Sequence, residues 1–207
     1  MSNQNPYSTE KPTTLYVMKK KYKKMLKVLK KSKAGNYFIY IREKVTHDLD
    51  VYVAAALEWL RSQGSPDFSV IIDSTGGDCR FGFSIYDQFM AYDGKITCTA
   101  TGLVESMASI IMQACDVRLM TTHAVMLIHN PSRNTVSLLT LIKSDKSKAL
   151  IKDLSATQER FVKVYKTRTG LTKKELLAQF EKEETMSARK SLKFGLIDKI
   201  VSKKFKK

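Results

Sequence analysis

No apolar run in this sequence approaches the roughly 18 residues needed to cross a bilayer, and the first residues lack the apolar core of a secretory signal. The three cysteines, Cys79, Cys98 and Cys115, do not have the spacing of metal ligands. The sequence therefore predicts a soluble, cytoplasmic protein with reduced thiols. Its pair of adjacent glycines matches neither the P-loop nor the dinucleotide fingerprint, which argues against nucleotide binding, and we expect no cofactor and no metal.

Acidic residues are scarce. The 207 residues include 36 lysines and arginines against 20 aspartates and glutamates, which gives a formal net charge of +16. This excess permits contact with nucleic acid or anionic lipid, because phosphate attracts a concentrated lysine surface, but it does not establish either. The length fits one domain, and we divide the chain into a polar and lysine-rich leader (residues 1–34), a folded domain (35–201) and a basic tail (202–207).

The leader contains a predicted amphipathic helix from Met18 to Lys33, which carries nine lysines. Its narrow apolar stripe consists of Tyr22, Met25, Leu26 and Leu29. Two interpretations stay open. The stripe docks on its own domain or on a neighbouring subunit, or the segment Lys19–Lys33 makes weak contact with nucleic acid or an anionic membrane.

Strands and helices alternate along the domain, which is typical of an α/β fold with parallel strands. The apolar pattern predicts strands at residues 37–41, 68–72, 96–100, 117–120, 124–128 and 196–201. It predicts helices at 46–63, 82–92, from 106 onward, 137–168, 172–180 and just before Gly195. The long helix at 137–168 is charged on most faces, so part of it should project from the domain or meet another subunit.

Ser106 lies where the strand that begins at Ile96 gives way to an apolar helix. The first backbone N–H groups of a helix have no internal partner and the helix dipole is positive there, so an anion that forms beside this hydroxyl would find donors. A serine nucleophile needs such a position. The alternative is that Ser106 only caps the helix, which is a common role for serine.

Two further sites stand near the ends of predicted strands. Gly76 and Gly77 follow the strand at 68–72, where a glycine backbone can approach a ligand closely, although turn formation alone would explain them. His129 follows the strand at 124–128, at the edge of an α/β sheet where ligands and catalytic groups gather. His123 lies at the opposite end of that strand and is a weaker candidate for a base, and His47 lies at a helix start.

Taken together, these stretches resemble the proteolytic subunit of the Clp protease family, a serine peptidase. The resemblance covers about residues 37–201. It rests on Asp73-Ser-Thr-Gly-Gly-Asp78, Ile85-Tyr-Asp87, Ser106-Met-Ala-Ser109, Val125-Met-Leu-Ile-His129-Asn-Pro131, Met186-Ser-Ala188 and Phe194-Gly-Leu-Ile-Asp198. It implies the fold of the Clp peptidase and crotonase superfamily, a spiral of strand-strand-helix repeats, with the helix at 137–168 as a projecting handle for oligomerisation.

The resemblance also implies site residues. Ser106 would be the nucleophile, His129 the general base and then acid, and the backbone N–H groups of Gly77 and Met107 the oxyanion hole. Glu183 stands where the family has the aspartate that orients the histidine. A glutamate can orient a triad histidine on other folds, but its extra methylene moves the carboxylate, and the alternative is a solvent-facing acid.

Three departures from the family pattern bear on activity and assembly. Glu105 precedes the nucleophile where a small residue is usual, Glu184 replaces an arginine used in ring-to-ring contacts, and the lysine helix replaces an apolar leader. We predict a serine endopeptidase that hydrolyses polypeptides through an acyl-enzyme in a homo-oligomeric ring, while a double ring and an unfolding ATPase partner stay open. The alternatives are a catalytically silent Clp-like structural or regulatory subunit and a crotonase-like acyl-CoA enzyme.

Overall fold

The computed structural model of the chain describes residues 37–133, 136, 140 and 142–202. The predicted helix of the leader lies outside these residues, as does nearly all of the basic tail. Within them the predicted α/β class with parallel strands is confirmed. Five parallel strands run in the order β1 (Tyr37–Ile41), β2 (Phe68–Ser74), β3 (Ile96–Glu105), β4 (Val117–Thr121) and β7 (Lys199–Val201).

Strand β3 extends five residues beyond its prediction and pairs with different strands along its length. Its first half, Thr97–Ala100, pairs with β4, whereas Leu103–Glu105 pairs with the short parallel strand β5 (Val125–Leu127). Strand β6 (Met186–Ser187) then adds to β5 in the antiparallel sense. The carboxyl ends of β3 and β5 therefore lie side by side, and these are the ends that carry the candidate residues.

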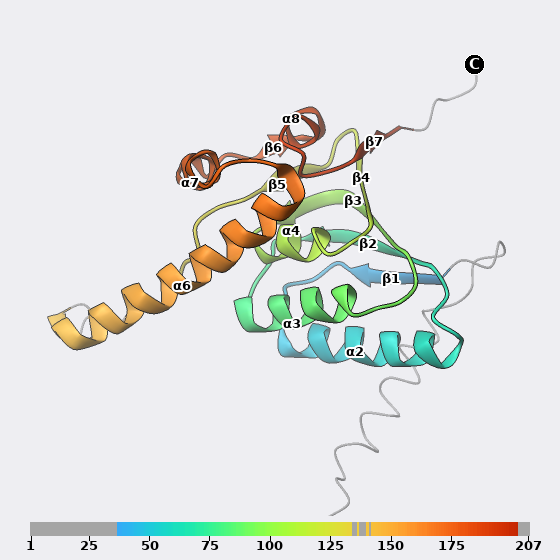
Figure 1. Cartoon of the computed structure of the whole chain (residues 1–207), viewed down its shortest axis with the longest axis horizontal. Helices are drawn as coiled ribbons and strands as arrows, with labels where there is room; N and C mark the ends of the chain where they lie inside the picture. Colours follow the sequence, from blue (N-terminus) through green and yellow to red (C-terminus); the bar gives the residue numbers. More distant parts are fainter. Residues whose placement is uncertain (1–36, 134–135, 137–139, 141, 203–207) are drawn as a thin grey trace, which may run out of the picture.

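Helices α2 (His47–Ser62) and α3 (Cys79–Met90) lie next to each other on one side of the sheet (Figure 1). Each begins at a polar cap: the Thr46 hydroxyl accepts from the Leu49 amide at 3.4 Å, and the Asp78 carboxylate accepts from the Arg80 amide at 2.8 Å. Helix α4 (Met107–Met112) is buried at all six positions. All of its residues except Ser109 are apolar, so the helix lies inside the core.

The handle helix α6 (Ser144–Thr169) projects from the domain, as predicted (Figure 1). Its buried residues are confined to the last third: Phe161, Val162, Val164 and Tyr165. Ile151, farther out, keeps 63% of its surface exposed. The helix begins later than predicted, because Lys143 is extended (φ −87°, ψ 108°) and separates α6 from the residues before it.

The last third of the domain follows its sequence signals closely. Helix α6 ends at Gly170, which is left-handed, and helix α7 (Lys173–Lys182) begins with the predicted capping box of Thr172 and Glu175. The Ser187 hydroxyl caps α8 (Ala188–Lys193). Strand β7 is shorter than predicted, because Leu196 and Ile197 are buried in the turn that precedes it.

The cysteines differ from the sequence prediction. Cys98 in β3 and Cys115 after α4 form a disulfide, so the prediction of reduced thiols is wrong for this pair; Cys79 is free. Both partners are fully buried and lie 17 residues apart in the chain. Across residues 37–133 and the later described segments, no helix combines the length and apolar character that a membrane span requires.

Candidate active site

Ser106 occupies the single residue between β3 and α4. Its backbone is left-handed in φ (φ 53°, ψ −124°), a conformation that costs a residue other than glycine about 1–3 kcal/mol and persists only where the surroundings impose it. The Ser106 amide donates to the Leu127 carbonyl in β5 at 2.9 Å. Its hydroxyl makes no capping hydrogen bond to α4. The interpretation of Ser106 as a helix cap alone therefore fails, and its hydroxyl has no hydrogen-bond partner among the described residues.

Gly76 packs directly behind the Ser106 turn. A Cβ added to Gly76 would lie 2.6 Å from the Glu105 carbonyl oxygen and 2.8 Å from both the Met107 nitrogen and the Ser106 Cβ. Its φ of +80° is also unfavourable for any residue with a Cβ. The absence of a side chain at this position thus lets the glycine turn and the serine turn touch through their backbones.

Gly77 follows Gly76 in the same turn and forms a backbone bridge with Val45. The Val45 amide donates to the Gly76 carbonyl at 2.8 Å, and the Asp78 amide donates to the Val45 carbonyl at 2.9 Å. The amides of Gly77 and Met107 are left without an acceptor among the residues that the structure describes. Two backbone amides, one in the glycine turn and one directly after Ser106, are therefore without an acceptor in the described part of the chain.

His129 follows β5 and is half-buried. Glu105 pairs with Leu127 in the parallel ladder, and His129 is two residues farther along, so the histidine and Ser106 leave neighbouring strands at the same edge. No hydrogen bond joins the Ser106 hydroxyl to the imidazole. The loop after His129 is anchored to the handle, because the Gln158 side chain donates to Asn130 Oδ1 at 2.7 Å. His123, in contrast, is exposed at the start of β5.

Glu183 caps the carboxyl end of α7 with a left-handed backbone (φ 47°) and is exposed. Strand β6 pairs Met186 with Met126 in the antiparallel sense, so the residues before Met186 run toward the end of β5 that carries His129. The Glu183 carboxylate makes neither an ion pair nor a hydrogen bond in the described part of the chain. Its neighbour Glu184 instead contacts Lys190 at 3.1 Å.

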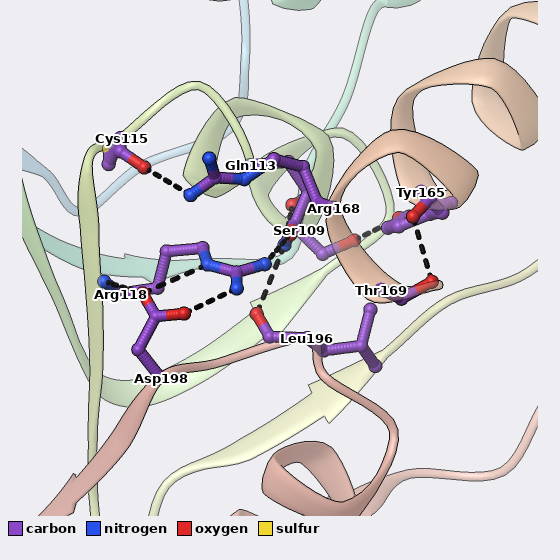
Figure 2. A network of polar contacts seen from close by, with 9 residues as sticks. All are labelled: Ser109, Gln113, Cys115, Arg118, Tyr165, Arg168, Thr169, Leu196 and Asp198. Atoms are coloured by element: carbon purple, nitrogen blue, oxygen red, sulfur yellow. Dashed lines mark hydrogen bonds and ion pairs between the residues drawn. The ribbon is translucent and has the colours of Figure 1, made fainter. Parts of the chain in front are cut away.

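A buried polar network that sequence reasoning missed begins at the carbonyl of Ser106 and continues through Ser109 and Gln113, which Figure 2 shows. Ser109 Oγ donates to this carbonyl at 2.6 Å and lies 2.6 Å from the Tyr165 hydroxyl. Gln113, which follows α4 as its C-cap, donates to the carbonyls of Ser109 at 3.1 Å and Leu196 at 3.3 Å. Hydroxyls and a side-chain amide therefore connect the Ser106 turn to the handle helix and to Leu196, which follows α8.

The network ends in an ion pair. Arg118 donates to Gln113 Oε1 at 2.6 Å and makes side-chain and backbone hydrogen bonds to the Asp198 carboxylate (Figure 2). The Arg118 side chain is 5% exposed. Burial acts to raise the pKa of Asp198, but the hydrogen bonds and positive charge of Arg118 outweigh it and hold that pKa below its usual value. The pair thus fixes the segment after α8 to β4.

Other parts of the described structure do not compete for the role of active site. No three His, Cys, Asp or Glu side chains among the described residues are placed to share a metal ion. A shallow hollow of about 560 Å³ is lined by residues of α2, α3 and α6, among them Arg61, Arg80 and Arg160, and contains none of the candidate residues. The chemistry-bearing groups instead gather where β3 and β5 end.

Comparison with known proteins identifies the family to which the chain is similar. The sequence pattern of the family described as Clp protease matches residues 19–204. ATP-dependent Clp protease proteolytic subunit 1 of Chlamydia muridarum is 29% identical over 168 residues, which cover 79% of this chain and 85% of that protein. The proteins of the same name from Chlamydia trachomatis serovar D and Protochlamydia amoebophila are each 29% identical, over 169 and 136 residues. The first covers 79% of this chain and 85% of the relative, and the second 64% of each. Because the family match spans most of the chain and the fold is the mostly parallel α/β fold expected for it, this chain belongs to the Clp protease family of serine peptidases.

Proposed function

We propose that the chain is an active serine endopeptidase in which Ser106 forms the acyl-enzyme. The observation that carries the proposal is the Ser106 turn itself: a strained backbone holds an uncommitted hydroxyl at the end of β3, against a glycine turn and beside the strand that leads to His129. Strain of this kind is commonly found at reactive centres, where it keeps a side chain exposed for reaction. Here it would present the nucleophile to a peptide.

In the proposed reaction, Ser106 Oγ attacks the carbonyl carbon of the substrate while His129 takes the hydroxyl proton. The negative charge that develops on the carbonyl oxygen would be stabilised by the amides of Gly77 and Met107, each of which could contribute about 3 kcal/mol. His129 then gives the proton to the leaving amine, and the acyl group stays on Ser106. Water, deprotonated by His129, hydrolyses this ester and restores the serine.

The proposal requires a movement of side chains. Ser106, His129 and Glu183 are not joined by hydrogen bonds in this structure, and catalytic hydrogen bonds commonly tighten only when substrate binds. Because β6 directs the chain of Glu183 toward the end of β5, a shift of the segment before Met186 in that direction would carry its carboxylate toward the imidazole. Glu183 is therefore proposed as the orienting acid.

We further propose that the active form is a homo-oligomeric ring that encloses the sites. The exposed apolar side chain of Ile151 (63%) on the outer part of α6, with Ile142 (66%) just before the helix, supports self-association through the handle. The relatives are named as subunits of an ATP-dependent protease, which favours polypeptide substrates delivered by an unfolding ATPase. Contact of the leader with nucleic acid or an anionic membrane stays a prediction, because it falls outside the described residues.

A catalytically silent Clp-like subunit is the second candidate. It is favoured by the missing hydrogen bonds between Ser106, His129 and Glu183, and by the Glu105 carboxylate next to the nucleophile. A carboxylate there would oppose charge on the oxyanion. A silent subunit would fold and assemble but would neither hydrolyse peptides nor react with reagents directed at serine nucleophiles.

Hydrolysis of a fluorogenic peptide by the assembled wild type and by alanine variants tests the proposal. Ser106→Ala and His129→Ala should reduce kcat by roughly 10³-fold or more, and Glu183→Ala by about tenfold or more. His123→Ala and Glu184→Ala are matched controls, since each removes the same type of side chain near the same strands, and both should keep wild-type rates. An inactive wild type, or a Ser106→Ala variant that retains activity, would contradict the proposal.

A further inference from the structure

Ser109 and Tyr165 form a buried hydroxyl pair next to the nucleophile turn (Figure 2). Ser109 in α4 is 0% exposed and Tyr165 in α6 is 1% exposed, and their oxygens lie 2.6 Å apart. Ser109 Oγ is also 2.6 Å from the carbonyl oxygen of Ser106. Polar groups buried this deeply cost stability unless they are hydrogen-bonded, so the pair is a specific feature of the site.

The direction of both hydrogen bonds follows from the acceptor at one end. A carbonyl oxygen can only accept, and the Ser106 carbonyl at 2.6 Å is much nearer than the Leu127 carbonyl at 3.5 Å, so the Ser109 hydroxyl donates its single proton to Ser106. Tyr165 must then donate to Ser109 Oγ. Burial raises the pKa of Tyr165 far above its usual value, and the hydrogen bond with Ser109 opposes this only in part, so the phenol stays protonated at neutral pH.

The carbonyl that receives this hydrogen bond belongs to the same peptide group as the Met107 amide. A peptide group is planar, so fixing its C=O direction also fixes the direction of its N–H. The ordinary helical amides of Ser109, at 3.0 Å, and Ile110, at 3.3 Å, also point at the Ser106 carbonyl, but the hydroxyl contact is the shortest of the three. Ser106 is strained, so this peptide needs such support to keep its orientation.

We propose that Tyr165 and Ser109 are positioning residues: through the chain Tyr165 O–H to Ser109 Oγ to Ser106 C=O, they aim the Met107 amide at the oxyanion of the substrate. This inference rests on the proposed function, because it gives the Met107 amide a role in the same reaction. It assigns the inner end of the handle helix a part in catalysis that does not require contact with substrate. Neither side chain touches the reacting atoms, and each acts through the peptide that follows Ser106.

Kinetics of Tyr165→Phe, Ser109→Ala and the double variant test the inference. Tyr165→Phe should lower kcat about tenfold with KM changed by less than about twofold, because the amide matters mainly in the transition state. The affinity for a peptide boronic acid, which forms a tetrahedral adduct with the serine, should fall by a similar factor. The double variant should be no slower than Ser109→Ala alone, since both changes break one chain.

Tyr92→Phe is the matched control. Tyr92 is also a buried tyrosine (8% exposed), and its hydroxyl donates to the Pro66 carbonyl at 2.8 Å, away from the site. This variant should lose a comparable hydrogen bond while keeping the wild-type kcat and boronate affinity. Thermal unfolding of all variants checks that each is folded, and Ser109→Ala, a change of one oxygen, guards against a misfolded Tyr165 variant.

The outcomes separate the two proposals. If the wild type hydrolyses peptide and Tyr165→Phe matches Tyr92→Phe in kcat and boronate affinity, the positioning role is overturned while the peptidase stands. If the wild type is inactive, the proposed peptidase fails. Crystal structures of the wild type and Tyr165→Phe then test whether Tyr165 fixes the orientation of the peptide between Ser106 and Met107. Rotation of the peptide between Ser106 and Met107 supports the inference, and an unmoved peptide overturns it.

Discussion

Replacing Gly76 with alanine should displace the turn that carries Ser106. The new methyl group would meet the Glu105 carbonyl oxygen at 2.6 Å and the Met107 nitrogen at 2.8 Å, both of them backbone atoms that cannot rotate away. Ordinary contact begins near 3.4 Å, so the two turns must separate by about 0.8 Å. A displacement of about 1 Å at a catalytic group can reduce the rate about 100-fold, so we expect kcat/KM to fall by about 30- to 100-fold.

Stability should fall as well, through two separable effects. The positive φ of Gly76 costs any other residue about 1–2 kcal/mol, and overpacking against the serine turn adds about 1–3 kcal/mol. Gly64→Ala isolates the first effect, because Gly64 has a similar φ (+89°, against +80°) and nothing within 4 Å of the added methyl group. We therefore expect Gly76→Ala to lose about 2–5 kcal/mol and Gly64→Ala about 1–2 kcal/mol.

Chemical denaturation of both variants measures the stability difference, and the rate of labelling by a serine-directed fluorophosphonate measures the effect on the nucleophile. Gly64→Ala should be labelled at the wild-type rate. If Gly76→Ala lost no more stability than Gly64→Ala and were labelled as fast as the wild type, the direct contact between the glycine turn and the serine turn would be wrong.

Three further predictions concern Asp198, in the segment after α8, and Ile151 in the handle helix. Asp198→Asn should destabilise the protein by about 1–2 kcal/mol in chemical denaturation, because the 5% exposed Arg118 loses its ionic partner while water screens the 40% exposed Asp198; a loss under about 0.5 kcal/mol would contradict this. Since the folded-state pKa of Asp198 is lowered, the stability that this pair contributes is complete above the usual carboxyl pKa and is lost as the pH falls below about 4. The melting temperature of the wild type should therefore drop more steeply below about pH 4 than that of Asp198→Asn. Ile151→Glu should dissociate the proposed oligomer in light scattering without unfolding the subunit, and an unchanged mass would exclude this part of the handle from the interface.

The elements of this fold could be predicted because their signals are local. Thr172 and Glu175 form the expected capping box, Gly170 ends the handle, and Ser106 lies at the expected junction of strand and helix. Residues near the ends of neighbouring parallel strands meet at one edge, so the common neighbourhood of Ser106 and His129 also followed from the order of the elements.

The features that escaped prediction depend on contacts between distant parts of the chain. Tyr165 and Ser109 are 56 residues apart, and nothing near either residue indicates the other. Gln113, a polar residue directly after the apolar segment of α4, indicated a buried hydrogen-bonding group, but the sequence did not identify its partners. The pairing of β3 with both β4 and β5 could not be predicted either, because the sequence of its second half resembles a loop that leads to Ser106.

The disulfide was missed for a related reason. Cys98 and Cys115 carry no spacing pattern, and only the return of the chain after α4 brings them together. Side-chain geometry at Glu183 could not be predicted either, since its position depends on how α7 ends and how β6 adds to β5. Sequence thus placed Ser106 and His129 near the ends of neighbouring strands, while the contacts around them required the structure.

Labelling of the intact, assembled protein with a fluorophosphonate, followed by peptide mapping in a mass spectrometer, tests the central claim most directly. The account predicts one phosphonyl group per chain, located on Ser106 and absent from the folded Ser106→Ala variant. His129→Ala should be labelled far more slowly, whereas His123→Ala should not differ from the wild type. A folded wild type that stays unlabelled under conditions that modify a known serine peptidase, or that is labelled at another residue, would contradict the claim.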